Sequence, residues 1–222
     1  MTIEWIKIGC LGLLFLPLFG VSELIYKFGK VEAEVSRKVA HIGTGLLSLL
    51  FPVFLSSHWS LATLCALFLL LLLLSLRLNF LPSINAISRK SFGSVLYPLA
   101  VYICFFVYDQ TGNKHLIYFY LPVLTLAISD PLAAYVGKTK PFGKYKRGSK
   151  TLAGSLAFML SAFLLACVFF SYFEGDLGFS RVVLYSFWLS LVCTVLEAVS
   201  KRGVDNILVP IGALAVLYLI FG

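Results

Sequence analysis

Charged residues are scarce in this sequence. Asp, Glu, Lys and Arg make up only 13% of its 222 residues, while 60% are hydrophobic. About a quarter of the residues of an ordinary soluble domain are charged, so the composition argues against that class. The longest apolar runs, such as 61–76, instead approach the stretch of about 20 residues that a helix needs to cross a hydrocarbon core.

Several other patterns are missing. The apolar runs are continuous rather than alternating, which argues against a membrane β-barrel and favours helices. The five cysteines are widely spaced, with no CxxC pair and no His/Cys pair at metal-ligand spacing, so we interpret them as packing residues. No internal repeat or low-complexity linker divides the chain, and we expect residues 1–222 to form a single domain.

The apolar runs therefore predict an all-α, polytopic membrane helix bundle of about eight transmembrane helices. The first run lacks the basic region and the small-residue cleavage site of a signal peptide, so we expect it to be a retained span. The predicted spans are 5–26, 39–55, 59–76, 92–108, 116–136, 152–173, 182–200 and 207–221.

The basic residues are distributed unevenly between the loops. All but three of the 18 Lys and Arg residues follow odd-numbered spans, the exceptions being Lys7, Lys114 and Arg181. Because loops rich in Lys and Arg stay in the cytoplasm, both termini are predicted to lie outside and the basic loop 137–151 in the cytoplasm. The net charge is +8. We expect the basic residues to contact anionic lipid headgroups or a phosphorylated substrate, and we expect no nucleic acid partner.

The basic loop 137–151 has the composition of a phosphate site. Glycines let backbone N–H groups approach phosphate oxygens, and interleaved cations offset the charge. A GxxxxGK[ST] pattern is absent, which excludes a P-loop. The N-terminus of the span 152–173 is expected to point at the same anion. The competing interpretation is a topological loop with turn glycines. The basic residues of the loop are Lys138, Lys140, Lys144, Lys146, Arg147 and Lys150, and its glycines are Gly137, Gly143 and Gly148.

Four acidic residues fall near the cytoplasmic side of the predicted bundle, namely Glu23, Asp130, Glu197 and Asp205. An ionisable group within a span is costly and points to a functional site. Asp130 is a candidate Mg²⁺ ligand or general base, or else it pairs with a lysine of the following loop. Glu197 and Asp205 suit the same metal site, although Asp205 is also placed to cap the last helix. Pro131 predicts a break in the helix that carries Asp130.

A third polar group opens the span 39–55. Arg37 and His41 are four residues apart, which places them on one helix face. A guanidinium group can bind phosphate through two parallel hydrogen bonds, so both residues are candidates for a place near a transferred phosphoryl group. The alternative is that Arg37 and Lys38 anchor the topology and His41 is a polar contact between helices.

Taken in order, these elements resemble the motifs of the polyprenol kinase family, which includes phytol kinase, dolichol kinase and the CTP-dependent diacylglycerol kinase. The first motif is the Arg-Lys-x-x-His pattern at 37–41. The central block runs from Ser129-Asp130 through Gly137-Lys138 and Phe142-Gly143-Lys144 to Ser149-Lys150-Thr151-x-x-Gly154-Ser155. The closing element is matched by Glu197, Asp205-Asn206 and Pro210. The chain is shorter than the dolichol kinases, and its size is closer to that of phytol kinases.

The resemblance implies phosphoryl transfer from a nucleoside triphosphate, commonly CTP, to the hydroxyl of a lipid alcohol at the cytoplasmic face of an integral membrane protein. Mg²⁺ or another divalent cation would be held by Asp130, Glu197 and Asp205. The acceptor's apolar tail would lie between spans and enter sideways from the bilayer. The catalytic residues would be Asp130, Lys150, Arg37 and His41, and the nucleotide-binding residues Lys138, Gly143, Lys144, Ser149, Lys150, Thr151 and Gly154.

Two alternatives are weighed against a kinase. The central block is also similar to that of phosphatidate cytidylyltransferases, which make CDP-lipids, but their Pro-x-His-Gly-Gly and Asp-Arg elements do not follow Pro210. An anionic-solute transporter needs charges near the bilayer midplane, whereas the candidate residues lie toward one leaflet. The acceptor (phytol, geranylgeraniol, a longer polyprenol or diacylglycerol), the choice among CTP, ATP and UTP, and the oligomeric state stay open.

Overall fold

The computed structural model describes residues 2–29, 31–78, 80–85, 92–112, 115–140, 142–144 and 150–222. Over these residues the chain is almost entirely helical, and the one β-type pairing is an isolated bridge between Lys144 and Thr151. The elements are α1 (Thr2–Phe28), α2 (Ala33–Ser48), α3 (Phe51–Phe54), α4 (His58–Leu78), α5 (Pro82–Asn85), α6 (Gly93–Gln110), α7 (Ile117–Leu124), η1 (Thr125–Ser129), α8 (Asp130–Thr139), α9 (Leu152–Phe173), α10 (Phe179–Val199) and α11 (Asp205–Phe221).

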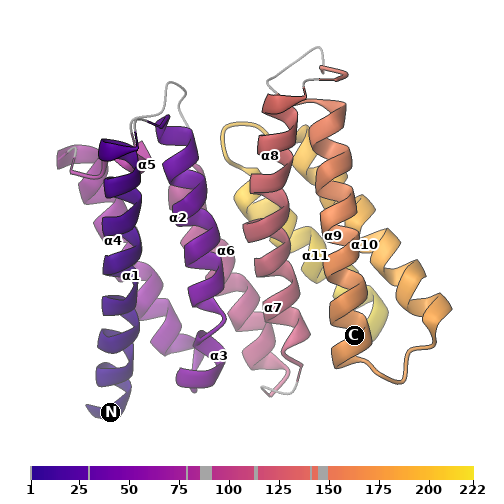
Figure 1. Cartoon of the computed structure of the whole chain (residues 1–222). Coiled ribbons are helices and arrows are strands. Elements are labelled where there is room, and N and C mark those ends of the chain that lie inside the picture. The colour runs from indigo at the N-terminus through magenta and orange to yellow at the C-terminus, as the bar shows by residue number, and fades with distance from the viewer. Residues whose placement is uncertain are drawn as a thin grey trace.

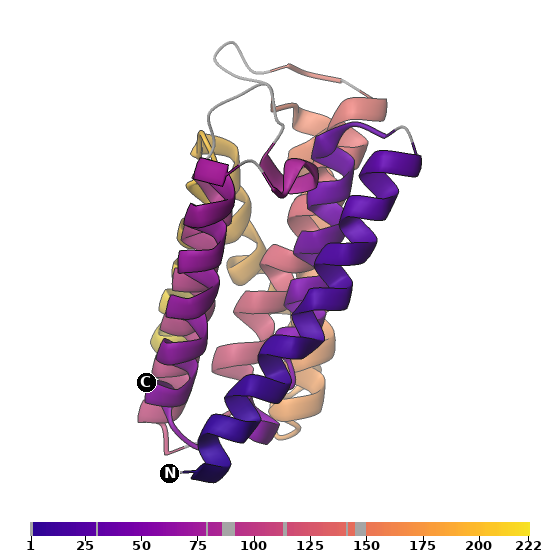
Figure 2. The same cartoon turned by 90° about the vertical axis from the view of Figure 1, so that its left-hand side faces the viewer.

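The helices form two groups (Figure 1). The first contains α1, α2 and α4, with the short α5 packed against α1 and α2. The second contains α8, α9, α10 and α11. α6 joins the groups, because it packs against α4 on one side and against α7 and α11 on the other. Both chain termini lie toward the end of the bundle opposite to the one where α8 ends and α9 begins (Figures 1 and 2).

Five helical segments are long and apolar enough to cross a membrane, namely Glu4–Phe28, His58–Leu78, Ile117–Thr139, Leu152–Phe173 and Phe179–Val199. The third of these comprises α7, η1 and α8, and α11 is apolar but shorter. The prediction of an all-helical, multi-pass bundle is confirmed, and each of the eight predicted spans overlaps a helix. The count of eight crossings and the side on which the termini lie stay predictions.

α9 shows how a hydrophobic helix without charged residues divides its faces. Residues four apart in sequence lie on the same face of an α-helix. At this spacing the core side of α9 carries small and aromatic side chains, and its outer side carries aliphatic side chains. The first set, fully buried, is Phe158, Ala162, Ala166 and Phe170, and the second, more than half exposed, is Leu156, Leu160, Leu164 and Val168. An exposed stripe of this kind is suited to lipid rather than to water.

The second predicted span differs from the structure at both ends. α2 begins at Ala33, so that Arg37 and Lys38 lie inside the helix and not before it. The helix then ends at Ser48, and a turn leads into α3, where Pro52 occupies the first turn. Proline lacks the N–H that an uninterrupted helix would use there and disfavours a helical residue before it. Because α2 begins earlier than predicted, Arg37 and Lys38 lie on this helix, which brings them close to the other helix group.

The predicted break at Pro131 is absent. Asp130 itself has ordinary helical dihedrals, and α8 continues through Pro131. The distortion lies one step earlier, in the π-helical turn η1 (Thr125–Ser129). A widened turn relieves the clash between a proline ring and the carbonyl four residues before it, and such turns are frequent at functional sites. The irregularity therefore sets the direction of Asp130 without interrupting the span.

Two glycine contacts hold the elements around Asp130 close together. A Cβ atom on Gly45 would overlap the side chain of Ala127, so α2 crosses η1 at a position that admits only glycine. A Cβ atom on Gly154 would lie 2.8 Å from the carbonyl oxygen of Ala133, so α9 approaches α8 through a second glycine. Small residues allow this kind of close crossing between membrane helices.

The Gly45 crossing leads to a prediction. Replacement of Gly45 by Ala should lower the free energy of unfolding by about 1–3 kcal/mol, because the added methyl group overpacks the contact with η1. Gly20→Ala is the matched control, since a Cβ at Gly20 meets nothing within 4 Å. Thermal unfolding in detergent should show a lower midpoint for Gly45→Ala alone, and equal midpoints for the two variants would contradict the close crossing.

Candidate active site

A cavity of about 1120 Å³ begins between the two helix groups and extends among the helices of the first. One end, which we call the polar mouth, is lined by Arg37, Lys38, His41, Asp130, Lys150, Glu197 and Asp205. The other, which we call the apolar arm, is lined by Phe15, Phe19, Phe51, Leu64, Cys65, Phe68 and Val101. Pockets for drug-sized molecules measure about 300–1,000 Å³, so this cavity is large enough for more than one small ligand.

Three carboxylates converge in the polar mouth. Asp130 begins α8, Glu197 lies in the last turn of α10, and Asp205 begins α11. Each offers an oxygen atom, and these atoms all lie within 4.8 Å of one another. Glu197 is buried, and its Oε2 atom has no hydrogen-bond partner in the described part of the chain. The predicted set of metal ligands is thus brought together, with an unsatisfied oxygen among them.

The fourth candidate acid does not join this cluster. A side-chain oxygen of Glu23 accepts a hydrogen bond from the backbone N–H of Ser83 at 3.0 Å, which ties α1 to α5. The expected capping role of Asp205 is also wrong, since the N-cap residue of α11 is Val204 and Asp205 is the first residue of the helix. The side chain of Asp205 is therefore directed to Lys150 and its own neighbour, Asn206.

Lys150 forms ion pairs with two of the acids. Its Nζ atom lies 2.5 Å from Oε1 of Glu197 and 3.1 Å from Oδ2 of Asp205. Burial opposes the positive charge of Lys150, but the carboxylates of Asp205 and Glu197 outweigh this effect and raise the pKa of its ammonium group above the usual value. Lys150 is therefore protonated at neutral pH, as a residue that binds an anion must be.

Lys38 neutralises the third acid and was missed as a site residue. Its Nζ atom forms an ion pair with Oδ2 of Asp130, and both side chains are mostly buried. The pair links α2 of the first helix group to α8 of the second. The sequence placed Asp130 beside a lysine of the following loop or a metal, but the lysine that reaches it lies 92 residues earlier. The sequence signal that could have identified Lys38 was its neighbour Arg37, a candidate site residue. Both had also been interpreted as residues that anchor the topology.

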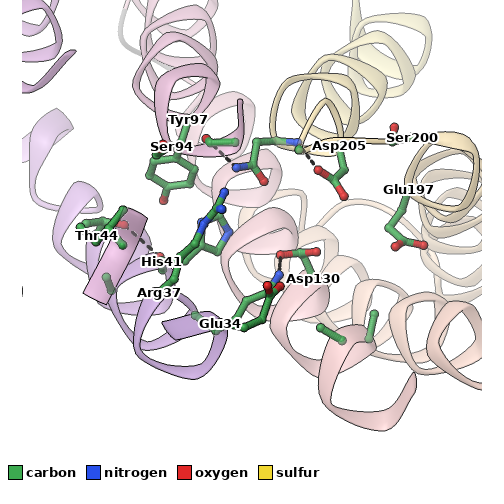
Figure 3. Close-up of a pocket in the computed structure, with 18 of the residues that line it drawn as sticks. Glu34, Arg37, His41, Thr44, Ser94, Tyr97, Asp130, Glu197, Ser200 and Asp205 are labelled. Atoms are coloured by element: carbon green, nitrogen blue, oxygen red, sulfur yellow. Dashed lines mark hydrogen bonds and ion pairs between the residues drawn. The ribbon is translucent and has the colours of Figure 1, made fainter. Parts of the chain in front are cut away.

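His41 and Arg37 complete the mouth from α2. Figure 3 shows both residues facing the space in front of Asp130, with Glu197 and Asp205 across it. The Nε2 atom of His41 lies 3.4 Å from the carbonyl oxygen of Leu126 in η1. Its ring also packs on Tyr97 of α6, with 4.6 Å between the centroids. Tyr97 lines the cavity and was not predicted, because a tyrosine in an apolar run carries no functional signal by itself.

The basic loop is placed only in part. Lys144 is exposed at the edge of the cavity, and Gly143 has a positive φ of 63° that favours glycine. Lys138 also borders the cavity, but it pairs with Glu32 at 2.6 Å on an exposed surface. Ser149 lies outside the described residues. The predicted roles of these residues in nucleotide binding stay predictions.

The N-terminus of α9 differs from the expected anion site. The N–H of Leu152 donates to Gly143 at 2.9 Å, that of Ala153 to Phe142 at 3.3 Å, and that of Gly154 to the Oγ1 atom of Thr151 at 3.1 Å. These amide groups are satisfied within the chain. Thr151 and Gly154 therefore shape the connection between loop and helix, and their predicted part in nucleotide binding stays a prediction.

Comparisons with known proteins agree with the sequence motifs. A phytol kinase from Synechocystis sp. is 30% identical to the chain over 213 residues, which cover 94% of this chain and 89% of that protein. No protein-family model matches the chain, and no solved structure is significantly similar to it. A match of this extent includes most of both helix groups. The chain belongs to the polyprenol kinase family, in the branch represented by phytol kinase.

Proposed function

We propose that the chain is a kinase of lipid alcohols, which transfers the terminal phosphoryl group of a nucleoside triphosphate, CTP in the first instance, to the hydroxyl of an isoprenoid alcohol or diacylglycerol. The observation that supports this function is the form of the cavity. Three carboxylates and several cations gather in the polar mouth, and the same cavity continues into the apolar arm. A charged donor and an apolar acceptor would meet where the two parts join.

The acids fit a divalent cation. Mg²⁺ is usually bound by one or two carboxylates together with substrate phosphates, and Asp130, Glu197 and Asp205 provide oxygens within 4.8 Å of one another. The unpaired Oε2 atom of Glu197 adds a buried acceptor that a cation would satisfy. When bound, Mg²⁺ would offset charge on the transferred phosphoryl group. Asp130 and Asp205 are the principal ligands that we propose, with Glu197 assisting.

The cations would bind the triphosphate. Phosphoryl transfer depends mainly on positioning and on neutralising charge, and a lysine serves as a point charge toward phosphate. Lys150 is held in the mouth and protonated, Lys144 lies at its edge, and Arg37 faces it from α2. Lys138, at the exposed rim, would contact the outer part of the nucleotide.

His41 is placed to orient the acceptor. An imidazole that donates from Nε2 to the carbonyl of Leu126 keeps Nδ1 as an acceptor for the alcohol's proton. In the transfer, the alcohol oxygen bonds to the γ-phosphorus, the bond from that phosphorus to the bridging oxygen breaks, and the nucleoside diphosphate leaves. The alcohol's proton passes to His41 or to one of the nearby carboxylates, which is the role of a general base.

Product analysis tests the proposed function. Purified chain in bilayer discs, supplied with Mg²⁺, a panel of lipid alcohols and each γ-labelled nucleotide in turn, should transfer the label to a lipid monophosphate and release the nucleoside diphosphate. Release of pyrophosphate with a CDP-lipid product would instead identify a cytidylyltransferase. Anion flux across a vesicle membrane without any lipid product would identify a transporter.

The metal assignment leads to a second prediction. Asp205→Asn should lower kcat/KM by a factor on the order of 10²–10³, because an electrostatic group at the reacting centre is lost. It should also reduce the rise in melting temperature that Mg²⁺ produces in the wild-type protein. Asp109→Asn is a suitable control, since Asp109 ends α6 without lining the cavity. An unchanged response to Mg²⁺ in Asp205→Asn would remove this residue from the metal site.

Lys150 provides a third prediction. Lys150→Met should abolish detectable transfer and, without Mg²⁺, lower the free energy of unfolding by about 3–5 kcal/mol, because Glu197 is left buried without a cation. Added Mg²⁺ should recover part of the lost stability but none of the activity. Lys140→Met, at an exposed residue outside the cavity, should change neither quantity. Wild-type turnover in Lys150→Met would contradict the assigned role.

A further inference from the structure

The apolar arm has a closed end formed by aromatic rings. Phe15 of α1 stacks on Phe51 of α3 with 6.0 Å between ring centroids, and it packs on Phe68 of α4 at 4.7 Å. All three rings line the cavity. Beyond them, Leu11 and Leu61 are buried in the core and do not line the cavity. The arm therefore stops at a wall of three phenylalanines, which we call the aromatic wall.

The depth of the arm follows from the helix beside it. His41 marks the polar mouth and Phe51 the aromatic wall, and the chain between them is helical apart from the turn at 49–50. Ten residues at a rise of 1.5 Å per residue correspond to about 15 Å. The hydrocarbon core of a bilayer is about 30 Å thick, so one leaflet is about 15 Å deep. The arm thus reaches about as far as one leaflet.

The lining of the arm suits a branched hydrocarbon chain. Its walls are phenylalanine, leucine and valine side chains, together with Cys65, from four elements, α1, α3, α4 and α6. The charged side chains of the cavity gather at the other end, and only the hydroxyl groups of Thr44 and Ser48 line the α2 side between His41 and Phe51. A hydroxyl placed near His41 would therefore leave the tail to run toward Phe51. The arm contains no charged group among its lining residues that an apolar tail would have to desolvate.

We propose that the aromatic wall limits the length of the acceptor, so that the arm accepts an isoprenoid tail of about one leaflet's depth and discriminates against long-chain polyprenols. The inference rests on the proposed kinase function and deepens it by naming the residues that select the substrate. The acceptors that fit are the shorter isoprenoid alcohols. A much longer tail would have to leave the arm before its end.

The experiment compares kcat/KM for farnesol, geranylgeraniol and a long-chain polyprenol. The wild-type protein should favour geranylgeraniol over the polyprenol. Phe51→Ala should open the aromatic wall and raise the ratio of polyprenol to geranylgeraniol activity about tenfold, which is the scale of discrimination that a hydrophobic pocket provides. Cys65→Phe should act in the opposite sense and lower the ratio of geranylgeraniol to farnesol activity about tenfold, because the new ring occupies part of the arm.

Matched controls distinguish an effect on substrate selection from an effect on the stability of the protein. Phe170→Ala removes an equally buried ring from α9, and Cys167→Phe enlarges a partly buried cysteine of the same helix; neither residue lines the cavity. Both should leave the ratios within twofold of wild type. If Phe51→Ala does not fold, the result for Cys65→Phe still decides.

Two outcomes would overturn the inference, and they are distinguishable. In the first, the wild-type protein phosphorylates lipid alcohols, but folded Phe51→Ala and Cys65→Phe keep the wild-type activity ratios. This result would exclude the aromatic wall as the selector and leave the kinase function standing. A folded wild-type protein that phosphorylates none of the alcohols would overturn the proposed function and this inference with it.

Discussion

The structure depends on the pairing of buried charges where its two helix groups meet. An isolated ionised group is expensive to bury, yet Asp130 and Glu197 are both buried in a chain that is 60% hydrophobic. Lys38 and Lys150 make this possible, because each brings an ammonium group to an acid on another helix. The first pair joins the two helix groups. Lys150, two residues before α9, connects the start of that helix to α10 through Glu197 and to α11 through Asp205. The same contacts therefore assemble the bundle and form the polar mouth.

In the proposed kinase, the lysines and the metal compete for the same oxygens. A divalent cation on Asp130, Glu197 and Asp205 would displace at least part of the contact with Lys150 and Lys38, and the released ammonium groups would lie beside the arriving phosphates. The cation would thus take over part of the charge compensation that the lysines provide before the nucleotide binds. This exchange explains why the strongest phosphate candidates lie against carboxylates in this structure and not in the exposed loop.

Much of this arrangement was predictable from the sequence, for physical reasons. Continuous apolar runs can satisfy their backbone only as helices, so the helical segments were found to within a few residues wherever no proline intervened; α9 begins and ends as predicted. Acids in an apolar chain are rare enough to stand out, and three of the four candidates do converge. The glycines and lysines of the loop 137–151 also stand out in the sequence, but its part in phosphate binding stays a prediction.

The remainder depended on contacts between distant segments. Lys38 looks like any loop lysine until the helix that carries it is known to begin at Ala33. The π-helical turn before Asp130 has no distinctive amino-acid composition by which the sequence could reveal it. Nor does the sequence show that the first amides of α9 are taken by Phe142, Gly143 and Thr151. The apolar arm was equally hidden, since its phenylalanines come from separate helices and are indistinguishable in sequence from core residues.

A π-helical turn and two close helix crossings surround Asp130. Gly45 lets α2 touch η1, the π-helical turn directs Asp130, and Gly154 lets α9 approach α8. Each of these features brings a charged or polar group of one helix toward a group on another helix, at a cost in packing or backbone geometry that a regular helix crossing would avoid. The cavity between the groups has one polar and one apolar end, and that is the form required to join a water-soluble donor to an acceptor that stays in the membrane.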